Sequence, residues 1–258
     1  HGLASVLGGY RSLGKLYRGI IEQDLRQYVM LADGSAMTDN LVYDAALPAG
    51  EVLNGHSGTK DDRLVFTEEN PGRDLYVAAG LAAASRVLKT YNPELSKECL
   101  ETSLKLYEKA TNTSTQATQN VTGQSSRNSS RQAGQRIIAL TELILATNRE
   151  DLMLELVNMK DAVIKDISRS GWAVGRVLPL LGALLFADEV TSAVAVYQSE
   201  VWQESVKSPF GVPYKPDIWG AGWNIQKFGV DQYFFCKGWP DLASEESYVN
   251  ALNFVLGI

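Results

Sequence analysis

The residues with the clearest potential for chemistry lie in one aromatic and glycine-rich stretch between positions 213 and 224. This stretch reads Pro-Tyr-Lys-Pro-Asp-Ile-Trp-Gly-Ala-Gly-Trp-Asn. An indole face can stack on the C–H face of a sugar ring while it excludes water, and nearby Asp, Asn and Lys side chains can bind the hydroxyl groups. Four residues of the stretch are therefore candidates for carbohydrate binding: Tyr214, Trp219, Trp223 and Asn224.

The spacing of the two tryptophans also fits a purely structural role. Trp219 and Trp223 are four residues apart, so on a helix they would share one face and could both point into the core. Packing is the commoner role for such a pair, and this stretch alone does not assign a binding function.

A second polar region, residues 31–73, is a long connection rich in Gly, Asp, Asn and Thr. It contains His56 and two adjacent acidic pairs, at 61–62 and 68–69. Two carboxylates across a sugar could perform acid–base hydrolysis, but adjacent acidic residues are more often solvated, and we expect these pairs to be so. The chain has only 2 histidines, too few for a histidine metal site or a catalytic triad to be a strong hypothesis. We therefore assign no catalytic residue and no metal ligand.

The composition is typical of a globular protein and disfavours a nucleic-acid partner. Hydrophobic residues make up 45% of the 258 residues, charged residues make up 21%, and the formal net charge is −6. A nucleic-acid partner would normally require a basic face. The apolar runs are shorter than the roughly 20 residues that span a membrane. Cys99 and Cys236 lie far apart, and we expect two buried thiols, with one disulfide as the alternative.

Apolar residues recur with helical spacing along most of the chain, which predicts an all-α fold. Asn92 before Pro93 is a strong helix start, residues 111–132 form a polar connection, and Pro179 should kink or restart a helix. Short connections favour antiparallel helical hairpins. The predicted helices span 3–27, 74–89, 93–110, 133–147, 150–167, 172–187, 189–205, 221–237 and 245–256.

Several motifs, in a consistent order, resemble the catalytic domain of family 9 glycoside hydrolases, the endoglucanase-type cellulases. Residues 70–74 and the alanine run that follows resemble the family's N-P-G-S-D segment and its central helix, with Arg63 and Phe66 upstream. Residues 139–147 are similar to an A-x-E-L helix, and Trp219 begins a turn similar to W-G-S. Two further segments match, 91–110 and 250–257.

The resemblance implies a single, partial (α/α)6 toroid over residues 1–258 that is built from helical hairpins. It also implies an inverting hydrolase of β-glucan-type polysaccharides that is secreted or periplasmic, with no cofactor apart from a structural calcium ion that is often bound. The family's tryptophan in the W-G-S turn stacks on substrate, which favours the binding interpretation of Trp219. Arg63 and His56 complete the predicted substrate-binding set.

The chain also departs from the family pattern. The family's D-A-G-D motif, which carries the base, and its acidic Glu do not occur in these residues. Trp223 and Asn224 replace a common Arg-Tyr pair. We therefore expect this piece to be inactive alone, to form an incomplete toroid, and to bind the missing N- and C-terminal segments of its domain or itself. The alternatives are a noncatalytic carbohydrate-binding or scaffold protein and another all-α toroid enzyme, such as a polysaccharide lyase.

Overall fold

A computed structural model describes residues 2–22, 39, 41–117, 125–214 and 220–258. The chain divides into two compact units, His1–Glu69 and Asn70–Ile258. Each unit is described by itself below. The single partial domain expected over the whole chain stays a prediction.

The first unit begins with a short helix followed by a strand, and not with the long helix predicted over 3–27. Helix α1 covers Gly2–Leu13, and strand β1 covers Tyr17–Glu22. The helix stops because Gly14 adopts a left-handed conformation, with φ of 65°, which a glycine tolerates. Strand β1 pairs antiparallel with β5, Arg63–Thr67.

A small three-stranded sheet completes the first unit. Strand β4 (His56–Ser57) lies between β2 (Val42–Tyr43), which is parallel to it, and β3 (Val52–Leu53), which is antiparallel. Asn54 and Gly55 join β3 to β4 with φ values of 53° and 80°, as the tight Asn-Gly hairpin turn requires.

The acidic pair at 61–62 is not the solvated pair that we predicted. Asp61 is buried, and its carboxylate accepts the backbone N–H of Asp39. Asp62 accepts the backbone N–H of Tyr43 at 2.6 Å. Both carboxylates therefore satisfy loop amides that would otherwise lack a partner, which explains why they lie inward.

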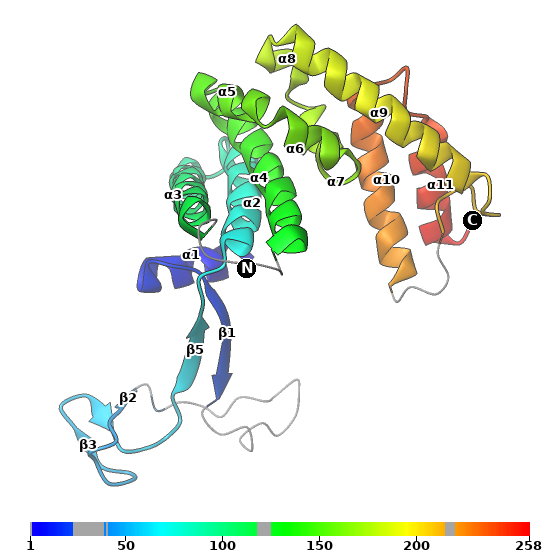
Figure 1. Cartoon of the computed structure of the whole chain (residues 1–258). Coiled ribbons are helices and arrows are strands. Elements are labelled where there is room, and N and C mark those ends of the chain that lie inside the picture. Colours follow the sequence, from blue (N-terminus) through cyan, green and yellow to red (C-terminus); the bar gives the residue numbers. More distant parts are fainter. Residues whose placement is uncertain (1, 23–38, 40, 118–124, 215–219) are drawn as a thin grey trace. The chain divides into compact units, whose positions relative to one another are not determined.

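The second unit is entirely helical among the residues that the structure describes, which confirms the predicted all-α class (Figure 1). Its helices are α2 (Pro71–Leu88), α3 (Pro93–Ala117), α4 (Ser125–Thr147), α5 (Glu150–Asn158), α6 (Lys160–Lys165), α7 (Ile167–Val174), α8 (Leu178–Leu181), α9 (Leu184–Ser205), α10 (Ala221–Gly238) and α11 (Glu245–Leu256).

Helix ends follow the predicted caps where cap residues are present, and differ from the prediction elsewhere. The side chains of Asn92 and Ser244 each accept a backbone N–H at a helix start. Asn70 caps α2 in the same way, three residues before the predicted start at 74. Pro179 restarts a helix, as predicted. Helix α3, in contrast, continues into the Thr-rich region to Ala117, because residues 111–117 contain neither Pro nor Gly to stop it.

Helix α2 packs against both α3 and α4 and is the central helix of these three (Figure 1). Its small residues permit this close packing: Ala78 and Ala82 are fully buried. The Ser103 hydroxyl of α3 donates to the carbonyl of Ala78 at 2.6 Å. The alanine run thus allows α3 to approach the α2 backbone directly.

Glycines allow α7 and α10 to approach each other closely. A Cβ on Gly175 would lie 2.6 Å from the Trp239 ring, and one on Gly238 would lie 3.0 Å from the Gly175 Cα atom. The Trp239 indole then donates to the Thr191 hydroxyl of α9 at 2.9 Å. These contacts join α7, α9 and α10 and so position the C-terminal end of α10.

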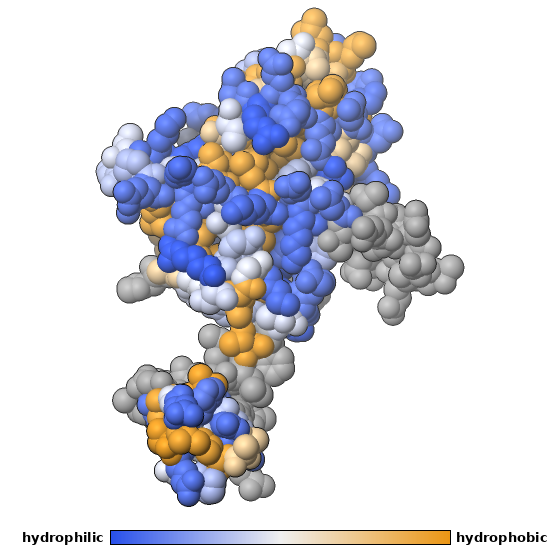
Figure 2. Space-filling model, turned by 90° about the vertical axis from the view of Figure 1, so that its left-hand side faces the viewer, coloured by the Kyte–Doolittle hydropathy of each residue, from blue (hydrophilic) through white to orange (hydrophobic). Residues whose placement is uncertain are grey.

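Apolar side chains gather at an end of the helical unit. Figure 2 shows them at its upper end, where α8 and the start of α9 lie. Leu184 and Leu185 are 80% and 79% exposed. Both cysteines are buried free thiols, as predicted. No helix in the described ranges is long and apolar enough to cross a membrane.

Candidate functional site

The aromatic stretch of residues 213–224 leads into α10. Gly220 precedes the helix in a left-handed conformation, with φ of 78°, which turns the chain into the first helical turn. Trp223 lies in that turn and is 75% exposed. The alternative that both tryptophans lie in the core is therefore wrong for Trp223. Trp219 lies outside the described residues.

Tyr214 is anchored in a small hydrophobic cluster beside this turn. The buried centre of the cluster is Val212, Ile225 and Ala251, and Tyr214 packs against it. Its ring lies 5.3 Å from that of Phe210 and 5.6 Å from that of Phe254, between ring centroids. Tyr214 is thus half-buried against a cluster that includes Ile225 of α10, whereas Trp223 is exposed to solvent.

The remaining predicted binding residues divide between the two units. Asn224 is exposed beside Trp223, and its backbone N–H donates to the Gly220 carbonyl at 3.0 Å. His56 is exposed on β4, and Arg63 begins β5, both in the first unit. Trp223, Asn224 and Tyr214 are therefore brought together, whereas His56 and Arg63 belong to a different compact unit.

Sequence reasoning missed a buried charged cluster around Glu142 on α4. The Glu142 carboxylate is ion-paired with both Arg86 of α2 and Arg176. The Arg176 guanidinium also lies over the rings of Trp172 and Phe234, at 5.9 and 5.0 Å from their centroids. The available signal was a single glutamate within the otherwise apolar stretch 137–144, where a charge requires a partner.

The other buried carboxylates of the second unit are paired as well. Asp74 lies 3.6 Å from the Lys109 ammonium, and Asp166 contacts the Arg169 guanidinium. Burial against a basic partner fits a structural role for these carboxylates, and we assign none of them as the catalytic acid.

Asp231 on α10 differs from these groups. Burial raises the pKa of its carboxyl above the usual value, and the contacting Lys227 ammonium opposes that rise. Burial also raises the pKa of the nearby Tyr197 hydroxyl to about 12. The Lys227 ammonium, one turn earlier on α10, contacts the Asp231 carboxylate, and we assign Asp231 no catalytic role.

The described residues do not offer a clear metal site. Nowhere in the described ranges do three or more His, Cys, Asp or Glu side chains gather in a way that could hold an ion. The calcium ion that the family resemblance implies would bind through carboxylates and carbonyl oxygens, and it stays a prediction.

Comparison with known proteins places these features in a family. The model of glycosyl hydrolase family 9 matches residues 26–249, most of the chain. The chain is also similar to the crystal structure of a metagenome-derived glycoside hydrolase family 9 endoglucanase, with a TM-score of 0.60 and 15% sequence identity. The likeness covers 99% of this chain and 44% of that one. No curated protein matches the sequence.

The structural likeness confirms the predicted fold. At 15% identity it concerns the fold alone, which is the all-α toroid type expected from the motifs. The chain spans less than half the length of the structure that it matches.

Proposed function

Because this chain belongs to glycosyl hydrolase family 9, we propose that it forms part of an enzyme that hydrolyses β-glucan-type polysaccharides with inversion. The observation that carries this proposal is the exposed Trp223 indole at the start of α10, beside Asn224 and above the cluster that anchors Tyr214. An exposed tryptophan on a rigid support is a suitable platform for a sugar ring. Trp219, next to this turn in sequence, is proposed to extend the platform.

The role of this piece within the proposed enzyme is binding. An inverting hydrolase needs an acid and a base about 6.5–9.5 Å apart across the scissile bond. The buried carboxylates Asp74, Glu142 and Asp166 of the helical unit are paired with Lys or Arg, which supports a structural role for them. We therefore propose that the acid and base come from other segments of the domain, and that this chain positions the glucan.

Titration of the 258-residue chain with cellohexaose tests this proposal. We expect calorimetry to detect saturable binding, while an assay for reducing ends detects no hydrolysis over the same period. Cellohexaose is the probe because its linear chain can lie along an aromatic platform. Absence of binding would contradict the proposal, and clear hydrolysis would contradict the placement of the catalytic groups outside this piece.

We also propose that further segments of the same domain cover part of this helical unit. Two observations support this: the chain covers 44% of the family structure it matches, and Leu184 and Leu185 are largely exposed where apolar side chains gather. Large exposed apolar patches usually mark contact surfaces. Without those segments, the chain should self-associate, and a monodisperse monomer in light scattering would contradict the proposal.

The proposed substrate also suggests a location. Polymeric glucans lie outside the cell membrane, so the proposed enzyme would be secreted or periplasmic. Fractionation of expressing cells tests this, and recovery of the protein only with the cytosol would contradict it.

A further inference from the structure

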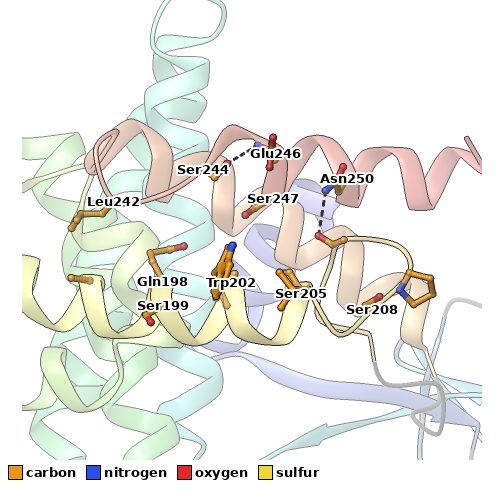
Figure 3. A pocket seen from close by; sticks show the side chains of 15 residues that line it. Gln198, Ser199, Trp202, Ser205, Ser208, Leu242, Ser244, Glu246, Ser247 and Asn250 are labelled. Atoms are coloured by element: carbon orange, nitrogen blue, oxygen red, sulfur yellow. Dashed lines mark hydrogen bonds between the residues drawn. The ribbon is translucent and has the colours of Figure 1, made fainter.

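A polar pocket lies between α9 and α11. Its volume is about 720 Å³, within the roughly 300–1,000 Å³ typical of small-molecule sites. Helix α9 contributes Gln198, Trp202 and Ser205, and α11 contributes Ser247 and Asn250. In Figure 3, Gln198 and Trp202 rise from α9 toward α11. The described lining residues do not include any member of the aromatic stretch 213–224.

Two polar atoms in this pocket are buried without a hydrogen-bond partner. The Gln198 side chain is 7% exposed, and within the described part of the chain nothing bonds to its Nε2 atom. The Ser205 hydroxyl oxygen is likewise buried without a hydrogen-bond partner in the described residues. Buried polar groups in folded proteins are nearly always paired, and an unpaired one destabilises the fold. These atoms are therefore placed to bond to something that enters the pocket.

Hydrogen bonds between side chains and the backbone hold the walls of the pocket. Asn250 of α11 donates from Nδ2 to the Gly211 carbonyl at 3.3 Å, which ties the loop after α9 to α11 (Figure 3). Ser244 caps α11 by accepting the Glu246 N–H at 3.2 Å. The Trp202 indole stays 66% exposed between these walls, so its face is available for stacking.

The character of the lining indicates a neutral, hydroxyl-rich ligand. Glu246 is the charged side chain among the described lining residues, and its negative charge disfavours an anion. An indole face together with an amide donor and several hydroxyls suits a sugar ring, which has one apolar face and polar groups around its edge.

We propose that this pocket binds a saccharide unit, which stacks on Trp202 and accepts a hydrogen bond from the Gln198 amide while its hydroxyls bond to Ser205. The choice of a saccharide rests on the proposed function, since the substrate there is a glucan. The pocket would hold an additional length of the polymer, or a second chain of it. The residues that bind it would lie outside the aromatic stretch.

Indole N–H resonances in a two-dimensional NMR spectrum test this inference. The chain has 5 tryptophans, and Trp202→Phe, Trp219→Phe and Trp223→Phe assign the relevant peaks in the full chain. Titration with cellotriose should move the Trp202 peak in a saturable way. In Gln198→Leu or Ser205→Ala, the same movement should need roughly tenfold more ligand, as expected for loss of one well-placed polar contact. Tyr76→Ala, an exposed aromatic of α2, is the control and should titrate like the wild type.

Melting temperature separates this role from a structural one. Gln198→Leu removes an unpaired buried amide, so its melting temperature should equal or exceed that of the wild type while binding weakens. If Gln198→Leu fails to fold, Ser205→Ala gives the same test.

The outcomes separate this inference from the proposed function. A Trp202 peak that does not move, while those of Trp219 or Trp223 do, overturns the pocket and leaves the proposed function standing. Movement of the Trp202 peak alone supports the pocket and contradicts the aromatic platform. Equal titration of Gln198→Leu, Ser205→Ala and the wild type overturns the pocket as described.

Discussion

At the residue scale, Glu142 is the centre of a buried charged cluster in the helical unit. It is buried, and Arg86 and Arg176 both contact its carboxylate. Removing one partner of a buried ion pair leaves the other charge uncompensated, which costs about 3–5 kcal/mol. We therefore expect Glu142→Gln to lower the free energy of unfolding by about that amount, measured by urea denaturation.

Glu101→Gln is the matched control for this prediction. Glu101 forms an exposed pair with Lys97 one helical turn away, and such pairs contribute only a few tenths of a kcal/mol, or about 0.3–0.5. A loss in Glu142→Gln no larger than that of the control would show that the cluster does not stabilise the fold.

Residue types predicted the aromatic stretch better than they predicted the charged groups. The exposure of Trp223 agrees with a binding role, but Tyr214 lies against a hydrophobic cluster. Asp61 is buried because loop amides need an acceptor. Such outcomes depend on which backbone groups come near a side chain, and a single sequence contains little information about that.

At the element scale, glycines decide how closely α7 and α10 pack. A Cβ on Gly171 would lie 2.9 Å from the ring of Phe235 and 3.0 Å from Ile167 Cδ1. The Phe235 ring is fully buried and lies against Tyr197 and Trp239, so it has little room to move. We expect Gly171→Ala to lower the free energy of unfolding by about 1–3 kcal/mol, as overpacking does, measured by thermal or urea unfolding.

Gly80→Ala on α2 provides the opposite case. Gly80 is also within a helix, but no atom lies within 4 Å of its added Cβ. Alanine there should stabilise by about 0.5–1 kcal/mol through helix propensity. If both variants were stabilised equally, the close approach of α7 to α10 would not be tight enough to require glycine.

Helices with clear caps were predicted closely, and the others were not. Helix α11 matches the predicted range 245–256, and Asn92 starts α3 as expected. The predicted helix over 3–27 contained four glycines, and Gly14 ends it at Leu13. The strand that follows pairs with β5, more than 40 residues away in the sequence, with Tyr17 opposite Thr67. Local periodicity cannot reveal such a distant partner.

At the scale of the whole molecule, ordered motifs predicted more than periodicity did. Helical spacing alone leads to an all-α class, whereas the family resemblance led to the toroid type that the structural likeness confirms. The division into two compact units was not predicted. It depends on which residues contact one another in three dimensions, and this cannot be read from the spacing of residue types.

We propose that the two tryptophans of the aromatic stretch, Trp219 and Trp223, bind glucan and do not serve the core. The most direct test is calorimetric titration of Trp219→Ala and Trp223→Ala with cellohexaose, with unfolding measured on the same samples. Each variant should lose roughly 1–2 kcal/mol of binding free energy, the scale of an aromatic contact, and keep the wild-type stability. Unchanged affinity with a stability loss of about 3–5 kcal/mol, as a buried truncation produces, would contradict the account.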